Sequence, residues 1–388
     1  MTMSSLPADL AALAAIHRAT LTSADLRTAG VGRRELERWV AAGALCRVGR
    51  GAYVDGAALR GASPEQAHVL TATAISRTWP QGFALSHDSA ALLHGLPLLT
   101  VPDTVRGIAT GGPPPSAPSS ASAPPPPRAA DPAPPGSAAA SASAPPGSAA
   151  ASASAPSPSA APQRRDPRPR KDTRTRKNAS ATIHRGESVL PTQSIAGCTV
   201  VAAAEAVFGV AALHGVEAGL VTLDAALHRT VEHVPEYGAP RPPGTVYLDE
   251  LATLNRALLN HPGHARFRQV RLLADPRCES PGESRTRWLL MNLGYRVRSQ
   301  VEVRDSAGRL AGRVDFALED EPVAVEFDGT GKYTQYGHTV ARDKARDQAM
   351  QRCGYEPVHL LWAHLRQPET VRAMVEHARE RVRRHRAA

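Results

Sequence analysis

Three acidic side chains lie close together in the C-terminal part of the sequence, inside two apolar runs. Asp315 stands in a Val-Asp-Phe run, and Glu326 and Asp328 stand in the segment PVAVEFDG. The β-branched and aromatic residues around them predict two strands. Because side chains alternate along a strand, Glu326 and Asp328 share one face. A tight turn between the strands would pair them antiparallel and bring Asp315 beside Glu326.

Carboxylates that meet in an apolar setting repel each other unless a cation lies between them. Mg²⁺ or Mn²⁺ prefers such hard oxygen ligands, so the sequence predicts Asp315 and Glu326 as metal ligands. A cation held there could polarise a phosphodiester and lower the pKa of a bound water. Glu283 begins a predicted helix and can point into the same corner, where Asp328 would also assist.

The elements that must position these acids are predicted in the order helix, three strands, helix, strand and last helix. Turn and capping signals between residues 278 and 386 place their boundaries, including Ser280 as N-cap and Pro281 in the first helical turn. The predicted helices are 280–294, 338–352 and 368–386, and the predicted strands are 295–303, 309–318, 322–329 and 355–362.

This block resembles the Vsr-like (very-short-patch-repair-like) domain of the PD-(D/E)XK nuclease superfamily. The resemblance rests on the segments SPGESRTRWLLMNLGY, GRVDFAL, VAVEFDGTGKY and ARDKARDQAMQRCGYEPVHLLWAHL. It implies a restriction-endonuclease-like core in which Asp315 and Glu326 bind the metal and Glu283 supports them. The superfamily's lysine normally lies two residues after the second acid, where this chain has Asp328. Lys332 is the nearest candidate to replace that lysine as an electrostatic helper.

Two interpretations of this block stay open. In the first, it is an active Mg²⁺-dependent endonuclease. In the second, it keeps the nuclease fold without catalysis, and its acids are ion-pair partners of nearby arginines such as Arg313, Arg342 and Arg346. Asp343 and Asp347, four residues apart on a predicted helix, are expected to pair with neighbouring basic side chains rather than a metal.

Residues 8–56 predict three short helices and a β-hairpin, which is the pattern of a winged helix-turn-helix. The third helix, in VGRRELERWVAAG, has apolar residues on one face and is placed to enter a major groove. The block resembles the N-terminal domain of AbiEi-type antitoxins through LTSADLRTAGVGRRELERWVAAGALCRVGRGAYV, which implies DNA binding. A protein-contact role is the alternative. The candidate DNA-binding residues are Arg33, Arg34, Arg38, Arg47 and Arg50.

Between these blocks lies a mixed α/β region, 64–110 and 180–262, divided by a segment rich in proline, alanine and serine. Residues 113–178 have too little apolar bulk to offset chain entropy, so they are predicted to be disordered. Their basic end, 164–177, carries eight basic residues and two acids, a net +6 of the chain's +10. It suits either a phosphate-contacting arm or a solvated linker. The β-prone flanks on either side of the segment predict a hairpin split by it.

The middle region itself shows no catalytic pattern. His87 and His94 lie seven residues apart on one predicted helix face. A metal-binding pair is one reading, and a helix cap with a buried, hydrogen-bonded imidazole is the favoured one. Asp224 is expected to be structural.

Composition sets the remaining limits on this chain of 388 residues. It is 42% hydrophobic, has four widely spaced cysteines, and has a pI near 9.9. These features predict a multidomain α+β protein of the cytoplasm with reduced thiols, no membrane segment and double-stranded DNA as partner. A toxin or other protein partner and a homodimer stay open. The predicted function is metal-dependent hydrolysis of DNA; the alternative is a non-catalytic, antitoxin-like transcriptional regulator.

Overall fold

The computed structural model describes residues 6–111, 181–233, 241–329 and 338–387, except for the side chains of 338–343. The predicted disordered insert at 113–178 lies outside the described residues. The described chain combines α-helices with three β-sheets, so the predicted mixed α+β class is confirmed. None of the described helices is both long and apolar enough to span a membrane.

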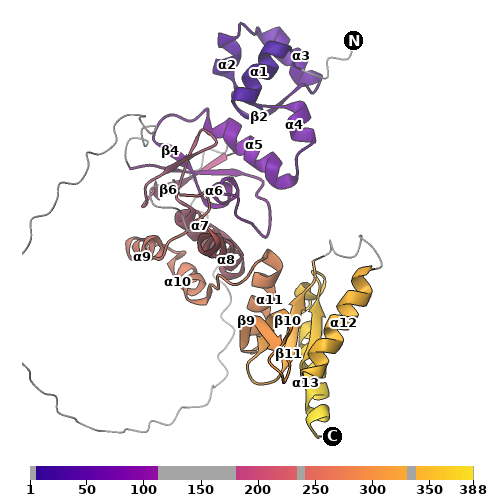
Figure 1. The fold of residues 1–388 in the computed structure, drawn as a ribbon. Coiled ribbons are helices and arrows are strands. Elements are labelled where there is room, and N and C mark those ends of the chain that lie inside the picture. Colours follow the sequence, from indigo (N-terminus) through magenta and orange to yellow (C-terminus); the bar gives the residue numbers. More distant parts are fainter. Residues whose placement is uncertain (1–5, 112–180, 234–240, 330–337, 388) are drawn as a thin grey trace, which may run out of the picture. The chain divides into compact units, whose positions relative to one another are not determined.

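The N-terminal residues form three helices around a small antiparallel sheet with the order β1-β3-β2 (Figure 1). Thr22 begins the second helix with a capping box, in which its side chain accepts from Asp25 N and its own N donates to Asp25 Oδ2 at 2.7 Å. Trp39 and Leu21 fill the core. The elements are α1 (Ala8–Ile16), β1 (Thr20–Thr22), α2 (Ser23–Thr28), α3 (Arg33–Ala41), β2 (Leu45–Gly49) and β3 (Ala52–Asp55).

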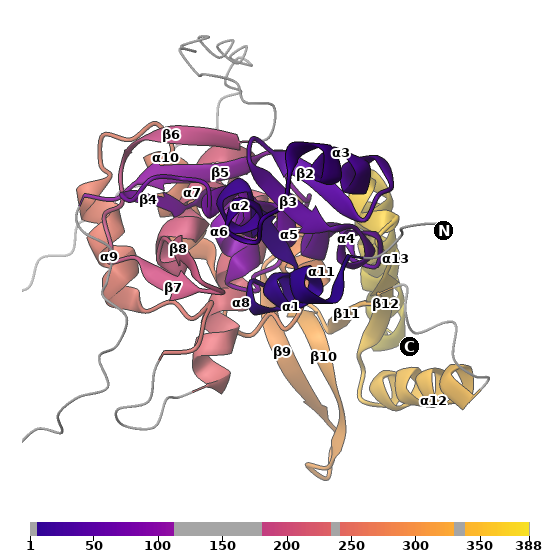
Figure 2. The same cartoon turned by 90° about the horizontal axis from the view of Figure 1, so that it is seen from above.

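The middle region contains a five-stranded sheet with the order β6-β5-β4-β8-β7, packed with alanine-rich helices. Its elements are α4 (Gly56–Arg60), α5 (Pro64–Ser76), β4 (Phe83–Leu85), α6 (His87–Leu93), β5 (Val105–Ala109), β6 (Ala181–Glu187), β7 (Gln193–Ile195), β8 (Cys198–Val200), α7 (Ala203–His214), α8 (Val216–Glu232), α9 (Leu248–Ala257) and α10 (His264–Leu273). Figure 2 shows β4, β5 and β6 side by side.

The two strands that flank the insert, β5 and β6, pair in parallel, with Val105 opposite Ala181. The predicted split hairpin is therefore wrong, although the two strands are neighbours as expected. A hairpin needs antiparallel strands joined by a turn, whereas a parallel pair needs a crossover of a dozen or more residues. The chain between these strands is long enough for such a crossover.

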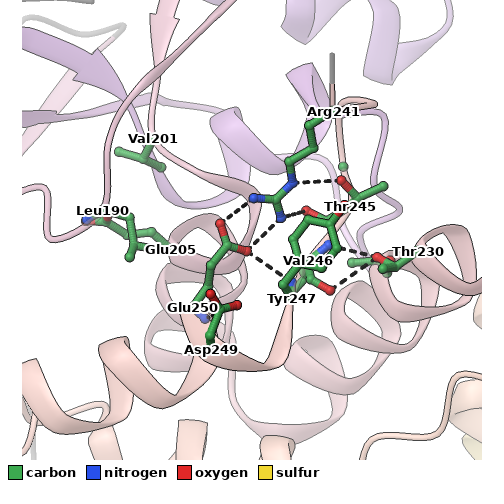
Figure 3. A network of polar contacts seen from close by, with 12 residues as sticks. Leu190, Val201, Glu205, Thr230, Arg241, Thr245, Val246, Tyr247, Asp249 and Glu250 are labelled. Atoms are coloured by element: carbon green, nitrogen blue, oxygen red, sulfur yellow. Dashed lines mark hydrogen bonds and ion pairs between the residues drawn. The ribbon is translucent and has the colours of Figure 1, made fainter. Parts of the chain in front are cut away.

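An arginine network fixes the segment that leads into α9 (Figure 3). Arg241 binds both carboxylate oxygens of Glu250, and its Nη2 donates to the Thr245 carbonyl at 2.6 Å. Glu250 also accepts a hydrogen bond from Tyr247 N at 3.0 Å, which caps the helix. The Thr230 hydroxyl of α8 accepts a hydrogen bond from Val246 N at 2.9 Å. This arginine therefore serves the fold rather than a nucleic-acid surface.

The C-terminal region is a four-stranded sheet between two helical layers (Figure 1). The strand order is β12-β11-β10-β9; β9, β10 and β11 are antiparallel, and β12 runs parallel to β11. Met350 of α12 packs on one face, and α11 and α13 cover the other. The elements are α11 (Pro281–Asn292), β9 (Val297–Arg304), β10 (Leu310–Leu318), β11 (Val323–Phe327), α12 (His338–Arg352), β12 (Glu356–Leu360), a 3₁₀ turn (His364–Arg366) and α13 (Pro368–Ala387).

A backbone irregularity interrupts the regular alternation of this sheet. In β9, Gln300 has φ of 52°, in the left-handed region that non-glycine residues seldom adopt. Val314 and Phe316 of β10 pair with Val301 and Ser299 on either side of it. Val314 packs in the cluster under α12, whereas Phe316 packs in the cluster under α11 and α13. The distortion thus lies opposite Asp315.

Candidate functional site

Asp315 and Glu326 lie beside each other on β10 and β11. The two strands pair antiparallel with Phe316 opposite Val325, so one step further along places Asp315 opposite Glu326. Asp315 Oδ2 accepts a hydrogen bond from Phe327 N at 2.7 Å, which ties its carboxylate to the end of β11. The structure therefore brings together the two acids that the sequence predicts as a pair.

Glu326 is a buried carboxylate with a raised pKa. It is only 6% exposed, and burial raises its pKa to about 7, against the opposing charges of Arg346 and His359. Arg346 of α12 donates from Nη1 to Oε2 at 3.1 Å. Its Nη2 lies 2.8 Å from Oε1 but is poorly aligned, so Oε1 accepts no hydrogen bond within the described part of the chain. The site thus holds a buried carboxylate that pairs with one arginine and has one oxygen without a hydrogen bond among the described residues.

His359 joins this site from β12, although the sequence patterns did not single it out. The parallel register of β11 with β12 places it opposite Glu326. Its Nδ1 lies 2.9 Å from Asp328 Oδ2, and its Nε2 lies 3.1 Å from Asp347 Oδ1. The hydrogen bond to Asp328 is the main cause that raises the pKa of His359 to about 9. A doubly protonated ring can donate to both carboxylates at once.

Two ion pairs of this region differ from those that the sequence suggested. Asp347 bonds His359 of the neighbouring strand rather than a basic residue of its own helix, because α12 lies against β12. Arg313 pairs with Glu279 at 2.9 Å, not with the buried acids. Of the three arginines considered as ion-pair partners for those acids, Arg346 is therefore the one that the described side chains place on Glu326.

Glu283 lies at the first turn of α11, where it serves mainly as a helix cap. Its Oε1 accepts from Ser280 Oγ at 2.7 Å, and its Oε2 accepts from Glu279 N at 3.0 Å and Gln300 Nε2 at 2.9 Å. Burial raises its pKa, and the charge of Asp315 adds to that shift. Glu283 therefore faces the same corner, but its oxygens are committed to the cap and to the distorted residue of β9.

The carboxylates of the site suit a divalent cation, but the described residues do not form a complete cation site. Among the described residues, no three His, Cys, Asp or Glu side chains are grouped so that they could hold a metal ion. Asp315 and Glu326 would supply two carboxylates, which suits Mg²⁺ because that ion usually keeps several waters. The orphan Oε1 of Glu326 fits a hard cation, provided that Arg346 gives way. Lys332 lies outside the described residues.

The arginines predicted to bind DNA lie on the surface of the N-terminal region. The side chains of Arg34 and Arg38 on α3 are exposed, and so are Arg47 and Arg50 on and after β2. Arg33 is exposed too, but its Nε bonds Glu37 of the same helix at 2.8 Å. An exposed pair of this kind is weak, so a phosphate could replace Glu37.

Comparison with known proteins identifies one part of the chain. Residues 8–54 match the family model described as transcriptional regulator, AbiEi antitoxin, which covers about an eighth of the sequence. The expectation that the N-terminal region is a DNA-binding regulator domain of antitoxin type is thereby supported. No curated protein and no solved structure matches the chain.

Proposed function

We propose that this protein is a cytoplasmic DNA-binding regulator whose C-terminal domain hydrolyses DNA phosphodiester bonds with Mg²⁺ or Mn²⁺. The observation that carries the proposal is the convergence of Asp315 with Glu326, a buried carboxylate with an unsatisfied oxygen and a raised pKa. Buried groups of this kind cluster at functional sites more often than in ordinary cores. The distorted backbone at Gln300 lies at the same place and adds to this argument.

Each residue of the site has its own role in the proposed hydrolysis. Asp315 and Glu326 hold the cation, which when bound supplies Lewis-acid activation of the phosphodiester and of water. His359 holds the carboxylate of Asp328 in place through a hydrogen bond. Arg346 leaves Glu326 and remains nearby as a positive charge for the phosphate. Lys332 is retained as a second helper, and Glu283 supports the corner through the helix cap.

DNA is delivered to this site by the N-terminal domain. Its family match and the exposed arginines of α3 and β2 support duplex binding. Phosphate contacts from these arginines would fix the position of the protein on the duplex. A toxin or other protein partner is consistent with the antitoxin-type family, and a homodimer would suit a two-fold symmetric operator.

A second function is favoured by the ion pairs of the same site. Arg346 compensates Glu326 directly, and His359 bridges Asp328 and Asp347. These contacts can stabilise the fold without a metal, as in a non-catalytic antitoxin-like regulator that retains a nuclease-like domain.

A nicking assay on supercoiled plasmid and mismatched duplexes, with Mg²⁺ or Mn²⁺, separates the two functions. The catalytic proposal expects metal-dependent nicking by the wild type and its loss in Asp315→Asn and Glu326→Gln. Glu302→Gln is the matched control, because Glu302 is half-exposed on β9 of the same sheet and pairs with Arg304. Wild-type protein that nicks none of these substrates while still binding duplex DNA would leave the regulator as the function.

A further inference from the structure

A second group of ionisable side chains lies in the middle region, on other helices and strands than the acidic site. The rings of His87 and His184 stack with their centroids 3.9 Å apart and an interplanar angle of 23°. Arg106 of β5 reaches the same place, with Nη1 3.4 Å from His184 Nε2. The group thus joins α6 with the two parallel strands β5 and β6. The regulator and nuclease functions leave it unused.

Two structural features that reduce stability accompany the position of His87. His87 has φ of 55°, in the left-handed region. Its ring also lies against Gly209 in the interior of α7, where a Cβ would come within 2.6 Å of the ring. Glycine weakens a helix interior, so each feature costs stability. An apolar residue at position 87 with ordinary backbone geometry would fill a core without either cost. Glycine at position 209 therefore leaves room for the backbone and ring of His87.

One carboxylate lies among the basic side chains around the two rings. Asp88 is the acid of the group, and its buried Oδ2 is already shared by Arg106 at 3.0 Å and His214 at 3.1 Å. The groups that act on His87 after burial are His184, Arg106, His261 and His214, and all of them oppose its protonation.

Burial and these neighbours lower the pKa of His87 to about 2, and that of His184 to about 4. Both rings are thus neutral at pH 7, and a neutral imidazole can donate one hydrogen bond to an anion.

We propose that His87, His184 and Arg106 form a binding site for a phosphate group on the middle region. An arginine fork matches phosphate oxygens, and Arg106 has hydrogen-bond donors beyond those that Asp88 and His184 occupy within the described residues. The side chain of Arg106 is 21% exposed, so part of this arginine contacts solvent.

Calorimetric titration of the full chain with inorganic phosphate at pH 7, at matched ionic strength in NaCl, tests this site. His184→Gln is the main variant, because β6 lies at the edge of the sheet and the substitution keeps a polar side chain. We expect it to weaken phosphate binding at least tenfold. His264→Gln is the matched control, since that histidine bonds Asn255 on other helices of the same region. Its affinity should equal that of the wild type.

Arg106→Lys provides a second variant, checked by thermal unfolding because Arg106 also pairs with the buried Asp88. It should also weaken binding at least tenfold, because lysine lacks the planar fork. A parallel titration with adenosine monophosphate distinguishes the source of the group. Tighter binding than phosphate indicates a nucleotide ligand, and weaker binding indicates free phosphate. Wild type that binds neither probe, or equal affinities for the wild type and His184→Gln, would overturn the proposal.

Discussion

Glu326→Gln should stabilise the folded protein at alkaline pH, although it removes one half of an ion pair. The ordinary pKa of the carboxyl is 4.5, and in the folded protein it is about 7. An acid with a raised folded pKa opposes folding when it ionises, so wild-type stability should fall as the pH rises from 4.5 through 7. The shift of about 2.5 pH units corresponds to about 3 kcal/mol at 1.36 kcal/mol per unit. Glutamine removes this penalty.

Urea unfolding at pH 5 and pH 8.5 measures the effect. The difference between variant and wild type should be small at pH 5 and reach about 2–3 kcal/mol at pH 8.5, because Arg346, with 38% of its side chain exposed, can be solvated after losing its partner. Glu302→Gln, half-exposed on the same sheet, should change stability by less than about 0.5 kcal/mol at either pH. A difference that does not change with pH would refute the reasoning about Glu326. Mn²⁺ should stabilise the wild type more than Glu326→Gln.

Three further predictions concern other charged groups. His359→Gln should lower the free energy of unfolding by about 1–2 kcal/mol at pH 6, and this difference should vanish as the pH rises through 9. The reason is that a raised folded pKa stabilises the fold only while the ring is protonated. A constant loss of stability across this pH range would contradict the prediction. Arg34→Ala and Arg38→Ala should each weaken duplex binding by about 1–3 kcal/mol in a fluorescence anisotropy titration, with exposed Arg256→Ala on α9 as the unaffected control. Wild-type stability should also fall as the pH drops from 6.5 toward 4, where His184 must protonate, and His184→Gln should flatten that dependence by about 1–2 kcal/mol.

The C-terminal sequence determines its local elements because the signals for them are local. Ser280 caps α11 through Glu283 N at 3.2 Å, and Pro281 lies in the first turn, as the sequence predicts. The alternation along two short strands joined by a tight turn also places Asp315 opposite Glu326. Pattern and turn geometry suffice here because the two strands are neighbours in the sequence.

The partners of these acids depend on contacts between distant segments. Arg346 and Asp347 approach the sheet from α12, and His359 reaches Asp328 through the parallel register of β12 with β11. A crossover rather than a tight turn joins parallel strands, so the residues between them do not indicate their register. The sequence therefore names the acids of the site but not the cations that compensate them.

The middle region shows the same limit more strongly. His94 is a buried imidazole that bonds Val201 O at 2.8 Å and accepts from Gly244 N at 3.1 Å, as the favoured reading predicts. His87, on the same short helix, instead stacks on His184, which lies beyond the long insert. The sequence determined the C-terminal elements and the acidic pair, because these depend on neighbouring residues. Only the tertiary structure decided the direction of β6 and the contact between His87 and His184. The reason is that packing sets the register of paired strands that lie far apart in the sequence.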